Sequence, residues 1–183
     1  MDILMEDSVF QMMQVKKQER EMARLEADND KTRLFGLSLN REEEEALVLC
    51  RNESLKKHRR VEFGEGILNK LIFEFCDSQY ISQDNYLDTL SRMQDIFYEF
   101  KNESNDLLTD DELMNFMKEQ FETICYGDLD YLEGTCMKVF TEAIRAGYRG
   151  YEKSQGFSEY SQFDTVQRWD KGLYYSILSE LLQ

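Results

Sequence analysis

The stretch QDNYLDTLSRMQDIFYEF, residues 83–100, decides the fold class of this chain. Its apolar residues recur at intervals of four, three, four and three, at Tyr86, Leu90, Met93, Phe97 and Phe100. Residues spaced in this way lie on one side of an α-helix, so the stretch predicts a helix with one buried face. Ser82, just before it, is a residue type that caps helix N-termini.

The segments that follow predict helices for the same reason. Thr109 and Glu112 form a capping box, and residues 113–124 carry a single apolar face. Gly127 stands where a glycine ends a helix. A further helix is expected over residues 129–146, because its apolar residues again recur at helical spacing.

The N-terminal half is similar but less regular. Residues 1–31 predict a charged helix, and residues 32–39 a short linker. Asn40 and Glu43 form a second capping pattern before a helix that ends near residue 58. Another helix is expected over residues 65–76.

Together these segments predict an all-α helical bundle of about six or seven helices. The chain contains no proline in 183 residues, which permits long helices. We expect a core domain over residues 32–149 and an irregular, aromatic-rich segment over residues 150–183 that packs on this core. Tyr148, Arg149, Tyr151 and Trp169 are weaker candidates for partner binding, because Tyr, Trp and Arg concentrate at interface hot spots.

The charge of the chain is strongly uneven. The formal net charge is −15, and residues 61–140 hold 18 acids against 5 bases. Spacings of three, four and seven place many of these acids along single helix faces. The candidates for an acidic, partner-binding face are Asp84, Asp88, Asp95, Glu99, Glu112, Glu119 and Glu122. A solubilising surface explains the same pattern, and that alternative stays open.

One basic cluster interrupts this acidity, at Lys56, Lys57, Arg59 and Arg60, with Arg51 and His58 nearby. It is a weak candidate for a phosphate site. The alternative is helix electrostatics. Bases at the C-terminus of a helix and acids at its N-terminus both stabilise it through favourable interaction with the macrodipole.

The sequence contains no clear pattern of an enzyme active site. His58 is the single histidine, and no catalytic residue, metal ligand or cofactor site stands out. GDLDYLEG, residues 127–134, departs from the calcium-loop template, and its Asp128 is better explained as a helix N-cap. The four cysteines have no metal-ligand spacing, and we expect reduced, buried thiols. Without a visible leader or a long apolar run, we expect a cytoplasmic protein that does not span a membrane.

Three stretches carry a family resemblance: RNESLKKHRRVEFGEGILNKLI, FCDSQYISQDNYLDTL and KNESNDLLTDDELMNFMKEQF. They resemble a family of small acidic bacterial proteins of unknown function, over roughly residues 33–149. In size and charge balance the chain is also similar to the inhibitors that phages and mobile elements make against restriction or CRISPR nucleases.

The leading hypothesis is therefore binding, not catalysis. The acidic face is expected to occupy a basic, nucleic-acid-binding surface of another protein. Direct binding to DNA or RNA is disfavoured, because the net negative field repels phosphates. A housekeeping adaptor or an oligomerising module is the alternative, so a homo-oligomer stays open, and a carboxylate-based metal-dependent enzyme is the third candidate.

Overall fold

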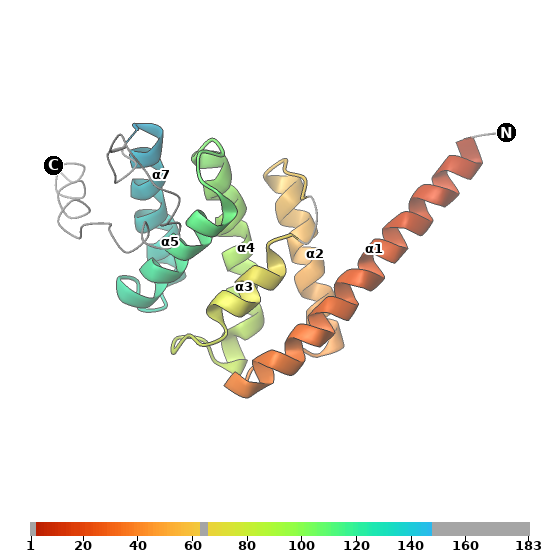
Figure 1. The fold of residues 1–183 in the computed structure, drawn as a ribbon, viewed down its shortest axis with the longest axis horizontal. Coiled ribbons are helices and arrows are strands. Elements are labelled where there is room, and N and C mark those ends of the chain that lie inside the picture. Colours follow the sequence, from red (N-terminus) through yellow and green to blue (C-terminus); the bar gives the residue numbers. More distant parts are fainter. Residues whose placement is uncertain (1–2, 63–65, 148–183) are drawn as a thin grey trace, which may run out of the picture. The chain divides into compact units, whose positions relative to one another are not determined.

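The computed structural model describes residues 3–62 and 66–147, and every regular element within them is a helix (Figure 1). This confirms the all-α class. The α-helices are α1 (Ile3–Thr32), α2 (Arg41–Lys57), α3 (Leu68–Phe75), α4 (Tyr86–Glu103), α5 (Asp110–Thr123), α6 (Leu129–Tyr131) and α7 (Lys138–Arg145). Two 3-10 helices, η1 (Arg33–Phe35) and η2 (Gln83–Asn85), and one π-helix, η3 (Leu132–Met137), complete the described elements.

The chain forms two compact units, residues 1–94 and 95–183, and α4 runs through the boundary between them. In the first unit, the C-terminal turns of α1 pack on α2 and α3, with Leu25 and Thr32 buried. The N-terminal half of α1 extends away from these two helices (Figure 1). The predicted N-terminal helix is therefore present over Ile3–Thr32, and its last turns belong to the core of the first unit.

Both capping boxes expected from the sequence are present. The Asn40 side chain accepts a hydrogen bond from the Glu43 amide at 3.0 Å, and the Glu43 carboxylate accepts one from the Asn40 amide at 2.7 Å. Thr109 and Glu112 repeat this exchange at the start of α5. Each box satisfies backbone donors that the first helical turn leaves without intrahelical partners, so the N-termini of both helices are fixed locally.

Buried polar groups hold the linker between α1 and α2. The Asn29 side chain accepts from the Leu39 amide at 2.7 Å and donates to the Leu39 carbonyl at 2.8 Å. The same side chain donates to the Glu44 carboxylate. Thr32 Oγ1 donates to the Leu37 carbonyl at 3.0 Å. Because these groups are buried, their loss would leave unsatisfied polar atoms, and the linker is therefore held in one conformation.

Glu44 lies in this buried network, and burial together with the nearby Glu26 raises its pKa. The folded state therefore binds this proton more tightly, so the contribution of Glu44 to stability falls as pH rises from about 4.5 through its folded pKa. Glu44→Gln keeps the Oε1 acceptor for Asn29 without the charge. We expect it to be at least as stable as the wild type at pH 7, with no advantage at pH 4.

Glu44→Ala is the matched control for this prediction, because it removes the acceptor and leaves one N–H of the buried Asn29 amide unsatisfied, the other being bound to the Leu39 carbonyl. It should cost about 1–3 kcal/mol at both pH values. Urea denaturation of both variants at pH 4 and pH 7 measures the effect. If Glu44→Gln and Glu44→Ala lower the free energy of unfolding equally at pH 7, the proposed role of the buried charge is contradicted.

The helix predicted for residues 65–76 begins later, at Leu68. Gly66 adopts a φ of 71°, in the left-handed region, which is incompatible with the first turn of a helix. Glu62 Oε1 accepts a hydrogen bond from the Ile67 amide at 2.9 Å. A Cβ at residue 66 would lie 2.5 Å from the Glu62 carboxylate, so this close approach also favours glycine.

In the second unit, a buried lysine holds the connection between α4 and α5. Lys101 is 8% exposed, and its Nζ lies 2.7 Å from Asp110 Oδ1. It also donates to the Leu108 carbonyl. The charge is therefore buried with a carboxylate and a carbonyl acceptor, as buried cations require.

The single helix expected over residues 129–146 is interrupted. The structure has α6, then the π-helix η3, then α7, and Gly147 ends α7 with a φ of 89°. In a π-helix, residues four and five apart share a face more closely than in an α-helix. This register buries Leu132, Cys136 and Met137 together, whereas a regular α-helix would turn Met137 away from Leu132.

Candidate functional site

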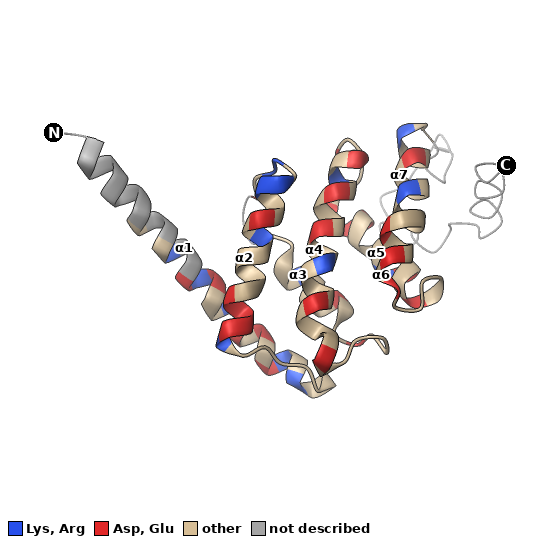
Figure 2. Cartoon of the chain, turned by 180° about the vertical axis from the view of Figure 1, so that it is seen from behind, with Lys and Arg blue, Asp and Glu red and all other residues tan. Residues whose placement is uncertain are grey.

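The acidic residues predicted to form a face lie on or beside α4 and α5, where Figure 2 shows bands of Asp and Glu. They differ in exposure. Three of them are exposed: Asp84, Asp88 and Glu112. Four of them are half-buried: Asp95, Glu99, Glu119 and Glu122. Asp84 and Asp88 belong to the first unit, and the other five acids belong to the second.

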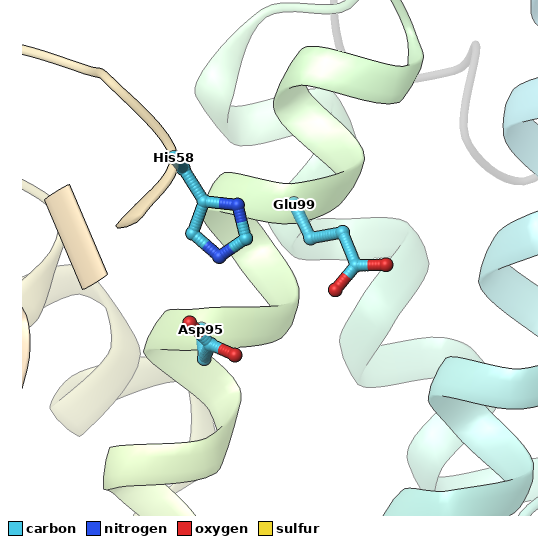
Figure 3. Close-up of side chains that lie close together, drawn as sticks. All are labelled: His58, Asp95 and Glu99. Atoms are coloured by element: carbon cyan, nitrogen blue, oxygen red, sulfur yellow. The ribbon is translucent and has the colours of Figure 1, made fainter. Parts of the chain in front are cut away.

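On α4, the acids follow one side of the helix. Asp88, Asp95 and Glu99 are spaced by seven and four residues, which places them on the same face. Figure 3 shows Asp95 and Glu99 one turn apart on α4. Carboxylates at this spacing repel one another at a cost of about 0.2–0.5 kcal/mol on an exposed helix. Such a pair favours a nearby cation.

On α5, Glu112 also has a structural role. Its carboxylate accepts from the Thr109 amide at 2.7 Å and from the Thr109 hydroxyl at 2.9 Å. Asp110 and Asp111 join it in the first turn, where negative charge interacts favourably with the positive end of the helix macrodipole. Acids here therefore stabilise the helix and also add to the surface charge.

Bases in the second unit compensate this charge only in part. Residues 95–147 contain 13 acids and 4 bases. Lys101 pairs with Asp110 at 2.7 Å, and Arg145 pairs with Glu103 at 3.2 Å. The segment therefore carries a strong net negative charge that its own ion pairs do not cancel.

The basic cluster lies at the C-terminus of α2, as the macrodipole explanation requires. Lys56 and Lys57 are in the last turn, and His58 is the C-cap, whose amide donates to the Ser54 carbonyl at 2.9 Å. Arg59 adopts a φ of 54°, and the chain turns away from the helix there. These positions match helix electrostatics, and no bound phosphate is needed to explain them.

Arg51 differs from the rest of the basic stretch because it is 4% exposed. Its guanidinium lies 2.6 Å from Glu21 of α1 and 3.7 Å from Glu62. The same group donates to the Asn52 side chain at 3.0 Å. Arg51 therefore joins α1, α2 and the segment before α3 in the interior of the first unit.

The GDLDYLEG segment has the structural role expected of it. Asp128 Oδ1 accepts from the Tyr131 amide at 3.0 Å and caps α6. Gly127 adopts a φ of 87° and donates to the Phe121 carbonyl at 3.0 Å, just after α5. These contacts account for Asp128 and Gly127 as turn and cap residues.

Two features were not anticipated from the sequence: the buried Arg51 network, and the approach of Cys125 to Cys136, whose Sγ atoms lie 3.6 Å apart. No local spacing signals either one, because each depends on the packing of separate segments. The predicted aromatic candidates Tyr148, Arg149, Tyr151 and Trp169 lie outside the described residues.

The fold and its charge define an acidic, all-α protein with paired buried ions and an acidic surface. The chain belongs to a family of unknown function, DUF6323, whose model matches residues 24–150. This match covers the region of the expected resemblance to a family of unknown function. Neither the curated proteins nor the solved structures gave a match. Among the described helices, none has the length and apolar character needed to cross a membrane.

Proposed function

We propose that this protein binds a basic surface of another protein, and that its acidic residues occupy a site that otherwise holds nucleic acid phosphates. The observation that supports this is the excess of acids in residues 61–140, which hold 18 acids and 5 bases and include Asp84, Asp88 and Glu112. Complementary charge across an interface steers association and selects partners.

The same charge opposes direct binding of DNA or RNA, because the phosphate backbone is itself densely negative. A basic groove in a nucleic-acid-binding protein, in contrast, attracts an acidic surface. Restriction and CRISPR nucleases belong to that class of partner, and the compositional similarity to their inhibitors is the reason to include them among the targets.

The exposed acids make the sharpest test, because their neutralisation leaves buried groups untouched. The test variant is Asp84→Asn, Asp88→Asn and Glu112→Gln. Glutamine at residue 112 retains an oxygen acceptor for the capping box. The matched control neutralises three exposed acids of α1 and α2, at Glu26, Glu42 and Glu53. Both variants change the net charge equally, so only the location of the change differs.

The wild type is immobilised and used to capture basic proteins from a lysate at low salt, and each captured protein is then purified. We expect the test variant to bind it at least about tenfold more weakly than the control, with affinity falling as salt rises. Duplex DNA should compete with the wild type for the same partner. Equal binding by both variants, without competition by DNA, would reject the proposal.

A further inference from the structure

Two buried cysteines of the second unit lie in direct contact. Cys125 follows α5 and is 5% exposed, and Cys136 lies in η3 and is fully buried. Their Sγ atoms are 3.6 Å apart, within hydrogen-bond distance for sulfur. A disulfide places the two sulfurs at about 2.05 Å, so each atom needs to move by less than about 1 Å.

The backbone holds Cys125 in place. Its amide donates to the Gln120 carbonyl at 2.8 Å, and its carbonyl accepts from the Asp128 amide at 3.0 Å. Tyr126 and Gly127 follow with φ values of 49° and 87°, which reverse the chain between α5 and α6. Cys125 is therefore presented by a tight turn and not by a regular helix.

The π-helix places the other thiol. Because η3 advances with a hydrogen bond between residues five apart, Cys136 and Met137 both turn towards the face that Leu132 occupies. The element packs against α5, after which Cys125 lies. Two unusual backbone features, the turn and the π-helix, thus bring these sulfurs together.

The remaining cysteines have a different environment. Cys50 Sγ donates to the Ser91 carbonyl at 3.8 Å, and Cys76 Sγ donates to the Phe73 carbonyl at 3.3 Å. In contrast, Cys125 and Cys136 hydrogen-bond to each other, and this bond, together with burial, raises the pKa of the Cys125 thiol. Because the thiolate is the reactive form, this raised pKa makes oxidation through Cys125 slow.

We propose that Cys125 and Cys136 are a modification site that a low-molecular-weight disulfide, such as oxidised glutathione, converts to an intramolecular disulfide. The Cys125 thiolate attacks one sulfur of the reagent, forms a mixed disulfide and releases one reduced thiol. The Cys136 thiolate then attacks Cys125 Sγ and releases the second. Two protein thiols are oxidised, the reagent is reduced to two thiols, and the two protein protons end on these products.

Cys125 is the entry point because it is the more exposed of the two residues and lies beside the exposed Tyr126. The reagent is larger than the opening that a 5% exposed residue offers, so the first step waits for the turn at residues 125–127 to open. The second step needs no further access, because Cys136 already lies against Cys125. The rate is therefore limited by formation of the mixed disulfide.

The test uses the full chain in two matched variants. Cys50→Ser with Cys76→Ala leaves only the proposed pair, and Cys125→Ala with Cys136→Ala leaves only the other two thiols. Each folded variant is incubated without denaturant in glutathione buffers of increasing oxidised fraction. The remaining thiols are then alkylated in denaturant, and the intact mass and the proteolytic peptides are measured.

The pair-only variant should lose about 2 Da, the mass of two hydrogen atoms, and resist alkylation at both sites. A peptide linking residues 125 and 136 should appear, and reduction should abolish it. The matched variant should alkylate at Cys50 and Cys76. If a substituted variant does not fold, the linked peptide is sought in the wild type. Full alkylation of both thiols in the most oxidising buffer, or a stable glutathione adduct without the link, would overturn the proposal.

Discussion

Arg51→Ala is expected to lower the free energy of unfolding by about 3–5 kcal/mol, the cost of leaving buried charges without their partner. Arg51 is 4% exposed, and its guanidinium lies 2.6 Å from Glu21 and 3.7 Å from Glu62. The two acceptor side chains are also shielded, at 17% and 10% exposed. Without the arginine, both carboxylates lose the cation that they contact. Chemical denaturation followed by circular dichroism measures the loss.

A neutral triple variant separates charge from packing in this prediction. Arg51→Met retains much of the side-chain volume, and Glu21→Gln with Glu62→Gln removes the charges that it would strand. The Glu62→Gln change keeps an oxygen acceptor for the Ile67 amide, which Glu62 Oε1 satisfies at 2.9 Å. We expect the triple variant to be more stable than Arg51→Met alone, since replacing a whole buried ion network often costs little. If Arg51→Met is more stable than the triple variant, the explanation by stranded buried charges is wrong.

Phe140→Ala is expected to be the second large effect, at about 3–5 kcal/mol, because it removes a buried aromatic ring and leaves a cavity. Phe140 of α7 stacks on Phe116 of α5, with ring centroids 3.6 Å apart and planes 9° from parallel. Phe116 and Phe140 are only 5% and 4% exposed. The stack therefore joins two helices of the second unit through apolar contact.

Phe140→Leu is the matched control, since it retains most of the volume and loses the ring. Apart from the lost ring stacking, this substitution should lower the free energy of unfolding by about 1.5 kcal/mol or less. A double-mutant cycle with Phe116→Leu should give a coupling energy of about 0.5–1.5 kcal/mol between the two rings. A coupling near zero would mean that the rings contribute by burial alone.

The helices and their ends were predictable because the information for them is local. The spacing of Tyr86, Leu90 and Met93 predicted α4, and the three residues are 1% exposed or less. Capping residues were equally reliable, because Asn40 and Thr109 bind amides only three residues away. Such short-range interactions occur at fixed sequence spacings, so the residue types at those spacings predict them.

The π-helix was not predictable in the same way. Residues 129–146 carry apolar spacing that suits one α-helix, and η3 departs from it at Leu132–Met137. A π-helix is rare and occurs mostly as a single turn within an α-helix, so the packing around it has to favour it over the regular helix. Here the gain is the joint burial of Leu132, Cys136 and Met137. That gain depends on the helices around η3, not on its own six residues.

Local patterns alone predict an all-α protein with acids concentrated in residues 61–140 and a basic C-terminus on α2. Hydrophobic period, capping pairs and charge counts are properties of neighbouring residues, so folding does not alter them. Packing between distant segments, in contrast, buries Arg51 among carboxylates and leaves Lys56 exposed. It also brought Cys125 and Cys136 to 3.6 Å. The physical reason is that burial and contact depend on which segments pack together, and a charge or a thiol looks the same in sequence whether water or protein surrounds it.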